Sequence, residues 1–240
     1  MIQFYCPDIE SNPTLPESES QHCVKVLRMT EGDTLVAVDG IGRRYSCRLI
    51  DAHPKHALVE IISSEDHPLP WSNNIAVAVA PTKSIDRMEW LVEKLTEVGF
   101  NRFIPLRCRF SERKDIKRER LEKIAVSAMK QSLKAMLPQI DEMTPIMSVI
   151  KSDEYAGRQK FIAYCDPSIP RRDIVEAYIP GRDTIILIGP EGDFSPEEIN
   201  AALAAGFIPV TLGDNRLRTE TAALYSATAF HILDSAKAPR

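Results

Sequence analysis

The chain has 240 residues, 44% of them apolar and 27% charged, and its formal net charge is −4. This composition is typical of a soluble globular protein that can bury a sizeable core in one large domain or two ordinary ones. The negative total disfavours a uniform basic coat for nucleic acid, and no apolar run reaches the ~20 residues that a membrane span needs.

The N-terminal sequence MIQFYCPDIESNP has neither a basic start nor a long apolar stretch. We therefore expect a cytoplasmic protein with no membrane segment. The five cysteines are scattered and none form a CxxC pair, which predicts reduced, mostly buried thiols. His53 and His56 have no further ligand at metal-binding spacing, so we expect a surface loop there and no metal site.

Residues 1–70 have the pattern of a small β-rich domain. Two β-branched, apolar runs flank the turn signal Asp39-Gly40, and HALVEII supplies a third. Short strands at close spacing favour a small barrel or sandwich. The polar segment SSEDHPLPWSNN, residues 63–74, carries two prolines and is the best candidate linker.

Residues 71–240 alternate between strand and helix patterns, which predicts an α/β domain with a mostly parallel, helix-covered sheet. The expected strands are NIAVAVA, RFIPLR, KFIAYCD, TIILIG and FIPVTL. One helix is expected to end at Gly99, a long basic helix to end before Pro138, and another to connect the last two strands. A final long helix should begin near Thr219.

Basic residues concentrate between Arg102 and Lys134, where 11 Lys or Arg stand against 4 Asp or Glu, whereas residues 1–70 hold 6 against 11. A stretch of this kind is often a solvated helix face. The same density of positive charge can also neutralise RNA phosphates, and the sequence leaves both interpretations open.

The stretch IGPEGDFSPEEI, residues 188–199, contains a complete set of helix-start signals. Ser195 is the expected N-cap, Pro196 the first helical residue and Glu198 the partner that closes a capping box. Phe194 and Ile199 are spaced as a hydrophobic staple. These local signals therefore explain the start of the helix. They do not explain the GPEG sequence that precedes it.

Gly189 and Gly192 are expected to let the backbone approach a neighbour closely and to expose N–H groups at the carboxyl end of a parallel strand, where open α/β sheets bind ligands. A second loop, LGDNRLRTE, again has a strand end, a glycine and a helix start. Two such loops would face each other across one crevice, which indicates a cofactor site. The chain lacks GxGxxG, GxxxxGK[ST], GxSxG and HExxH patterns, so a dinucleotide fingerprint, a phosphate loop, a hydrolase elbow and a zinc protease are disfavoured.

IGPEGDFSPEEI and LGDNRLRTETAAL resemble the two signature segments of the ribosomal RNA small-subunit methyltransferase E family, which are S-adenosylmethionine enzymes of the SPOUT class. KSIDRMEWLVEKLTEVGF and AMKQS are similar to its first two helices, and HCVKVLRMTEGDTLVAVDG to its PUA-type RNA-binding barrel. The chain departs from the family pattern at Asp193 and Leu133, where glycine is usual. Aspartate tolerates left-handed backbone better than most residues, so the first loop is expected to keep its path.

The resemblance implies a PUA-like RNA-binding β-barrel over residues 1–70 and a SPOUT methyltransferase domain over residues 71–240. It further implies a deep trefoil knot in the second domain and a homodimer. The implied reaction is methylation of N3 of a uridine in 16S ribosomal RNA, with S-adenosyl-L-methionine as cofactor and the RNA or the small ribosomal subunit as partner.

Two residues are candidates for catalysis. Arg218 would stabilise the negative charge that reaches the uracil oxygens as N3 loses its proton. Glu220 is the candidate base, although a carboxylate in a first helical turn is also explained by the helix dipole. Glu191 is a second acid that could equally shape its loop as a hydrogen-bond acceptor.

The remaining candidates bind cofactor or RNA. The cofactor-binding set is expected to be Ile188, Gly189, Pro190, Glu191, Gly192, Leu212, Gly213, Leu217, Arg218 and Thr219. The RNA-contacting set is expected to be His22, Lys25, Arg28, Lys83 and Arg87, with the basic stretch from residue 102 to 134, unless these are only surface charges.

Two other functions remain possible at this point. One is methylation of a ribose 2'-hydroxyl in another RNA. The combination of the N-terminal barrel with LRTETA instead favours methylation of a base at N3. The other is an inert RNA-binding module, against which the glycines of both loops, Arg218 and Glu220 speak.

Overall fold

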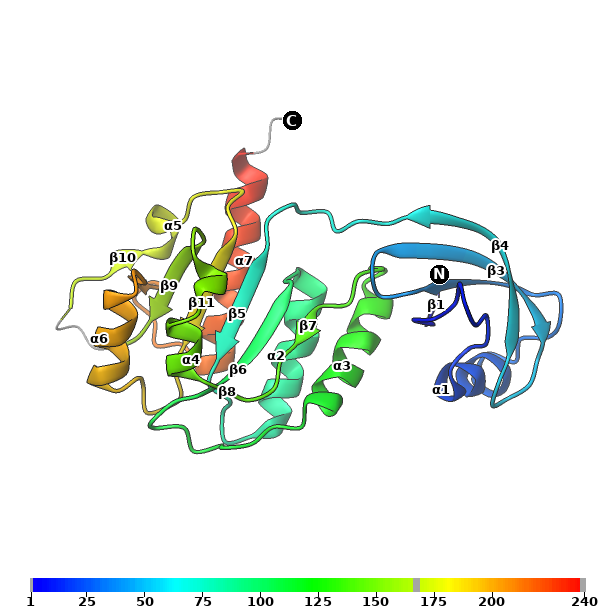
Figure 1. Cartoon of the computed structure of the whole chain (residues 1–240), viewed down its shortest axis with the longest axis horizontal. Coiled ribbons are helices and arrows are strands. Elements are labelled where there is room, and N and C mark those ends of the chain that lie inside the picture. Colours follow the sequence, from blue (N-terminus) through cyan, green and yellow to red (C-terminus); the bar gives the residue numbers. More distant parts are fainter. Residues whose placement is uncertain (1, 166–168, 238–240) are drawn as a thin grey trace. The chain divides into compact units, whose positions relative to one another are not determined.

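A computed structural model describes residues 2–165 and 169–237, and Figure 1 shows the course of the chain. The chain divides into two compact units. The first contains Met1–Trp71 and Ala125–Leu137, and the second contains Ser72–Ile124 and Pro138–Arg240.

The first unit is built on a four-stranded sheet in the order β1-β2-β3-β4. Its strands are β1 (Gln3–Tyr5), β2 (Thr34–Val38), β3 (Arg43–Asp51) and β4 (Leu58–Asp66). β1 is parallel to β2 and the other pairs are antiparallel. The expected Asp39-Gly40 turn joins β2 to β3, because Asp39 Oδ1 accepts hydrogen bonds from the backbone N–H groups of Ile41 and Arg43.

Several parts of this unit were not predicted from the sequence. The sequence analysis missed β1, the helix α1 (Glu17–Gln21) and the π-helix η1 (His22–Val26), because ESESQ and HCVKV show no helical periodicity. The predicted linker at residues 63–74 is wrong in its first part, since β4 continues to Asp66 through its pairing with β3.

Residues 125–137 pack with the first unit, whereas the sequence interpretation placed them in the second domain. Gly42 N–H donates to Ala135 O, and Leu137 N–H donates to Gly40 O. These bonds join segments far apart in sequence, so no local pattern could reveal them. The limits 1–70 and 71–240 stay a prediction for independently functioning domains.

The second unit contains an eight-stranded, parallel sheet in the order β10-β12-β9-β11-β5-β6-β7, with β8 paired to β6. The five expected strands are confirmed as β5 (Ile75–Val79), β6 (Arg102–Arg107), β9 (Gln159–Ala163), β11 (Thr184–Ile188) and β12 (Ile208–Thr211). The short strands are β7 (Gln139–Ile140), β8 (Thr144–Pro145) and β10 (Arg172–Asp173).

Helices cover both faces of this sheet (Figure 1). The four expected helices are confirmed as α2 (Ile85–Val98), α3 (Arg118–Gln131), α6 (Pro196–Ala204) and α7 (Thr219–Lys237). Residues 125–131 of α3 belong to the first unit. The remaining ones are α4 (Ile146–Ile150), α5 (Ile174–Ala177) and the 3-10 turn η2 (Asp153–Tyr155). Because side chains alternate along a strand, Ala76 and Ala78 pack in one core cluster with residues of α4 and α6, while α7 contacts β5 and β11 from the other side.

The parallel arrangement brings the carboxyl ends of β5, β6, β9, β11 and β12 to one edge of the sheet. Both loops singled out in the sequence begin at that edge. Within the described residues, every helix is too short or too polar to span a bilayer.

Candidate functional site

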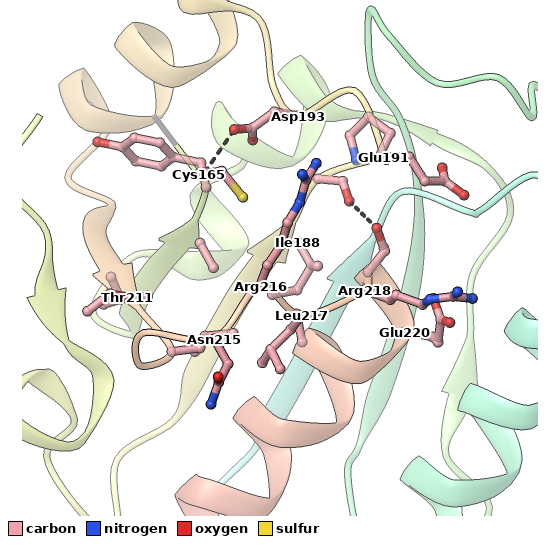
Figure 2. A pocket seen from close by; sticks show the side chains of 18 of the residues that line it. Cys165, Ile188, Glu191, Asp193, Thr211, Asn215, Arg216, Leu217, Arg218 and Glu220 are labelled. Atoms are coloured by element: carbon pink, nitrogen blue, oxygen red, sulfur yellow. Dashed lines mark hydrogen bonds between the residues drawn. The ribbon is translucent and has the colours of Figure 1, made fainter. Parts of the chain in front are cut away.

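A cavity of about 650 Å³ opens at the carboxyl edge of the second unit's sheet. The segments after β11 and β12 border it together, as Figure 2 shows. The two strands are not adjacent, however, because β9 lies between them. Its end therefore contributes a third wall, formed by Tyr164 and Cys165 with Arg171.

Every residue of the expected cofactor-binding set lines this cavity, as do Glu220 and Arg87. The sequence analysis missed the other lining residues, which are Ala163, Tyr164, Cys165, Arg171, Asp193, Val210, Thr211, Asn215, Arg216 and Ala222. Those after β9 carry no glycine or motif that could have revealed them. Only the strand order places them at the site.

The first loop ends in the predicted helix start. Ser195 accepts a hydrogen bond from Glu198 N–H while the Glu198 carboxylate accepts one from Ser195 N–H, which completes the capping box. The close approach expected at Gly189 is also observed: a Cβ at Gly189 would lie 3.2 Å from the Phe194 ring. A larger residue at position 189 would therefore require the Phe194 ring to shift by a few tenths of an ångström.

Asp193 lies in the left-handed region, with φ of 63°. Its Oδ1 accepts a hydrogen bond from Phe194 N–H and its Oδ2 one from Cys165 N–H, both at 2.8 Å, and Figure 2 shows the bond to Cys165. Its own N–H donates to Pro190 O at 2.9 Å. The side chain thus connects two walls of the cavity, which explains how the loop accommodates a residue other than glycine.

The second loop is joined to the first through Thr219. Its hydroxyl donates to Gly189 O at 3.1 Å (Figure 2). Gly213 has φ of 94°, a conformation that favours glycine. No hydrogen bond among the described residues uses the N–H groups of Gly213 or Leu217, and the first N–H groups of α7 are unsatisfied by helix geometry. The loop therefore offers donors to a ligand.

Glu220 and Arg218 lie together at the start of α7. The Glu220 side chain is only 9% exposed, its Oε1 lies 3.7 Å from Arg87 Nε, and its Oε2 has no hydrogen-bond partner within the described residues. The Arg218 side chain is exposed and forms no ion pair with any of the described residues. A buried acceptor without a partner is costly, so Glu220 is suited to receive a hydrogen bond from a ligand.

Glu191 has an observed loop-shaping contact. Its Oε1 accepts a hydrogen bond from Lys83 N–H at 3.3 Å. This bond joins the first loop to the segment between β5 and α2. It supports the second of the two roles considered for Glu191.

The candidate RNA-contacting residues are divided between the units. His22, Lys25 and Arg28 fall within one short segment of the first unit, where Lys25 and Arg28 are exposed. In the second unit, Lys83 is exposed and lies 3.5 Å from Glu112, whereas Arg87 lies in the cavity. Arg87 is therefore placed to act on Glu220, and its contact with RNA stays a prediction.

Four of the 11 basic residues between Arg102 and Lys134 form ion pairs with carboxylates of the described residues. Arg102 pairs with Asp141 and Glu154, Arg118 with Glu122 and Glu142, Arg120 with Glu89, and Lys130 with Glu19. Three of the four basic side chains of α3 are therefore paired with carboxylates, and the solvated-face and RNA-contact interpretations both stay predictions. Fewer of the positive charges remain available for RNA than the sequence count indicates.

The cysteines are free, and four of the five are buried, as expected. Cys165 is the exception, because it lies exposed at the cavity. Within the described residues, no three His, Cys, Asp or Glu side chains gather closely enough to hold a metal ion.

Two family descriptions match the chain. The RNA methyltransferase domain matches residues 69–231, and the RNA methyltransferase PUA domain matches residues 15–62. The second match lies within the first unit, whereas the first match covers most of the second unit and also residues 125–137 of the first.

Individual proteins match over nearly the same length. A Synechocystis protein named ribosomal RNA small subunit methyltransferase E is 30% identical over 89% of this chain and 71% of its own. The crystal structure of a probable rRNA-methyltransferase from Porphyromonas gingivalis is 44% identical, covers 98% of this chain and 99% of its own, and has a TM-score of 0.93. The crystal structure of a ribosomal RNA small subunit methyltransferase E from Neisseria gonorrhoeae, solved with S-adenosyl methionine, is 26% identical. It covers 97% of this chain and 98% of its own, and has a TM-score of 0.80.

Proposed function

This chain belongs to the ribosomal RNA small subunit methyltransferase E family, and we propose that it methylates N3 of a uridine in 16S ribosomal RNA with S-adenosylmethionine as the methyl donor. The observation that carries the proposal is the cavity at the sheet edge, where two glycine-containing loops meet a buried carboxylate and an exposed arginine. The family's named activity supports the substrate.

The residues of the cavity fit S-adenosylmethionine. A cavity of about 650 Å³ is within the usual range for a ligand of this size. The free N–H groups of Gly213 and Leu217, with backbone groups of Ile188, Gly189 and Leu212, offer donors and acceptors for the adenosine and the methionine tail. The bound cofactor supplies an electrophilic methyl group attached to a sulfonium, so the protein's task is to bind and orient it.

Arg218 is proposed as the electrostatic catalyst. Loss of the N3 proton would spread negative charge over N3 and the uracil ring oxygens. This charge would be neutralised as N3 forms its bond to the methyl carbon and the bond between that carbon and the sulfonium sulfur breaks, which releases S-adenosylhomocysteine. The Arg218 guanidinium has no carboxylate partner among the described residues, so its charge is available at the cavity mouth. Fixed charge of this kind acts most strongly where charge develops in the transition state.

Glu220 is proposed as the group that accepts the N3 proton. Its Oε2 lacks a hydrogen-bond partner within the described residues, which leaves it free to accept the N3–H of a bound uracil. Arg87 Nε lies 3.7 Å from Glu220 Oε1 and helps to hold the carboxylate at the cavity.

The test is methylation of small ribosomal subunits from a strain that lacks the gene. Arg218→Ala should lower kcat by about 10²- to 10³-fold, the usual loss when one transition-state donor is removed, while S-adenosylmethionine binding in calorimetry is retained. Glu220→Gln should lower kcat without weakening cofactor binding more than a few fold. Normal turnover by Arg218→Ala would remove that residue from the mechanism.

We further propose that the enzyme is a cytoplasmic homodimer, as the family resemblance implies. Two large apolar side chains of α7 support a protein contact, since Tyr225 is 44% and Ile232 is 62% exposed. On α2, which contacts α7, Trp90 is 42% exposed. Light scattering that gives twice the chain mass is the expected result, and a monomer at micromolar concentration would contradict it.

A further inference from the structure

A segment of eleven residues, 107–117, runs from the last residue of β6 to the start of α3 at the cavity edge of the second unit's sheet. We call it the basic loop, because five of its residues are Lys or Arg and two are acidic. β6 is separated from β11 by β5 only. The basic loop therefore starts at the same sheet edge as the first cavity loop.

Specific hydrogen bonds fix the path of the basic loop. Arg109 N–H donates to Glu198 Oε1 at 2.8 Å. The Arg113 guanidinium donates to Thr82 O at 3.1 Å and to Lys83 O at 2.6 Å. The loop is thus held against α6 and the segment between β5 and α2, so its exposed side chains start from a fixed scaffold.

The basic loop also touches the wall of the cavity. A Cβ added at Gly192, which lines the cavity, would lie 3.2 Å from Phe110 Cβ. The Phe110 side chain therefore packs at its base against the first cavity loop, while the residue remains 46% exposed. An exposed aromatic ring stands next to the proposed cofactor site.

Most positive charges of the basic loop are not paired with a carboxylate of the described residues. Within the described residues, four of its exposed basic side chains form no ion pair or side-chain hydrogen bond. They are Arg107, Arg109, Lys114 and Lys117. This contrasts with Arg102, Arg118 and Arg120, which are paired with carboxylates.

We propose that the basic loop binds the single-stranded RNA that flanks the target uridine, with one base stacked on Phe110 and the phosphates on the four free basic side chains. The inference rests on the proposed function and names the surface that delivers its substrate. Uracil N3 lies on the pairing edge of the base, so the target nucleotide must be unpaired when it reacts. Its neighbours are then exposed, and aromatic rings beside basic groups bind such strands.

Stacking is tested by two variants of Phe110 in the full-length protein. Phe110→Leu keeps an apolar side chain against Gly192 but removes the ring, and Phe110→Tyr keeps the ring. With small ribosomal subunits from the gene-deletion strain, Phe110→Leu should raise KM about tenfold or more, the usual effect of one lost base stack. Phe110→Tyr should stay within about twofold of the wild type, and both should bind S-adenosylmethionine normally in calorimetry.

Phosphate contacts are tested with the combined change Arg107→Gln, Lys114→Gln and Lys117→Gln. The slope of log affinity against log KCl for the same subunits should become shallower by about 2, because each phosphate contact on a single strand contributes roughly 0.7. Arg182→Gln is the matched control: Arg182 is exposed and lies before β11, at the opposite edge of the sheet. It should leave the slope unchanged.

The outcomes separate the two proposals. Suppose that the wild type methylates the subunits, that Phe110→Leu has the wild-type KM, and that the triple variant has the wild-type salt slope. The basic loop then does not bind the substrate strand, and this inference alone is overturned. A wild type that binds S-adenosylmethionine but methylates no subunits overturns the proposed function and the inference with it. If Phe110→Leu and Phe110→Tyr both bind S-adenosylmethionine more weakly, Phe110 has a structural role at the cofactor site. That result also overturns this inference.

Discussion

Asp193 combines an unfavourable backbone conformation with two hydrogen bonds across the site. Its φ of 63° costs a residue with a Cβ about 1–2 kcal/mol, and its carboxylate offsets this by accepting from Cys165 N–H and Phe194 N–H. Both connected segments line the cavity. Asp193 is therefore placed to position the walls of the cofactor site.

We expect Asp193→Ala to weaken S-adenosylmethionine binding by about tenfold or more, since it keeps the backbone strain and loses both hydrogen bonds. Asp193→Asn retains an acceptor and should stay within a few fold of the wild type. Asp193→Gly removes the strain as well as the bonds, and should fall between them. Calorimetry measures all three, and wild-type affinity in Asp193→Ala would rule out the positioning role.

Cys165 provides a chemical probe of the same cavity. It is the exposed thiol, whereas burial raises the pKa of Cys108 to about 12 and that of Cys47 to about 11, which keeps those thiols protonated and unreactive. In the native protein, N-ethylmaleimide should modify Cys165 first, and S-adenosylmethionine should slow the reaction.

Peptide mass spectrometry over time measures this labelling. Cys165→Ser should leave no rapidly labelled thiol. An unchanged labelling rate at saturating S-adenosylmethionine would contradict the placement of the cofactor beside Cys165.

At the scale of elements, α3 ends in a Schellman motif with an unusual residue. Lys134 N–H donates to Met129 O and Leu133 N–H to Lys130 O, which is the bond pattern of that motif. Leu133, with φ of 56°, occupies the left-handed position where glycine is favoured. Both positions at which the chain departs from the family's glycines thus require left-handed backbone.

Leu133→Gly should stabilise the protein by about 1 kcal/mol, because glycine adopts this conformation without the steric cost of a Cβ. The Leu133 side chain is 45% exposed, so little packing is lost. Thermal unfolding should shift upward by roughly 2–4 °C. Leu133→Ala retains the strain and is the control, and equal stability of the two variants would refute the explanation.

How much of the site could be predicted depended on whether its determinants are local. The Ser195 capping box and the Gly189 turn are decided within a few residues, so the sequence predicted α6 and the first loop. The contribution of Cys165 was missed because it depends on β9 lying between β11 and β12. The pairing of Arg87 with Glu220 likewise joins residues far apart in sequence.

At the scale of the whole molecule, the buried thiols predict a pH dependence of stability. Burial raises the pKa of Cys6 and Cys47 to about 11 and that of Cys108 to about 12, from an ordinary value of 9.0. Above pH 9 the unfolded chain releases these protons while the folded one holds them. Stability is therefore complete below pH 9 and falls as the pH rises toward 11 or 12.

The melting temperature should accordingly be constant near pH 8 and decrease between pH 9 and 10.5 in calorimetric scans. Cys108→Ser removes one such group, because serine does not titrate, and should make the decrease shallower whatever its effect at pH 8. An identical slope in Cys108→Ser would show that Cys108 does not contribute.

The trefoil knot implied by the family resemblance stays a prediction.

We propose that the enzyme methylates N3 of a uridine in 16S ribosomal RNA at the cavity on the sheet edge. Mass spectrometry of nucleosides from purified 16S RNA tests it directly in a strain that lacks the gene. We predict that 3-methyluridine disappears on deletion and returns with the wild-type gene but not with Arg218→Ala. Persistence of 3-methyluridine in the deletion strain would contradict the account.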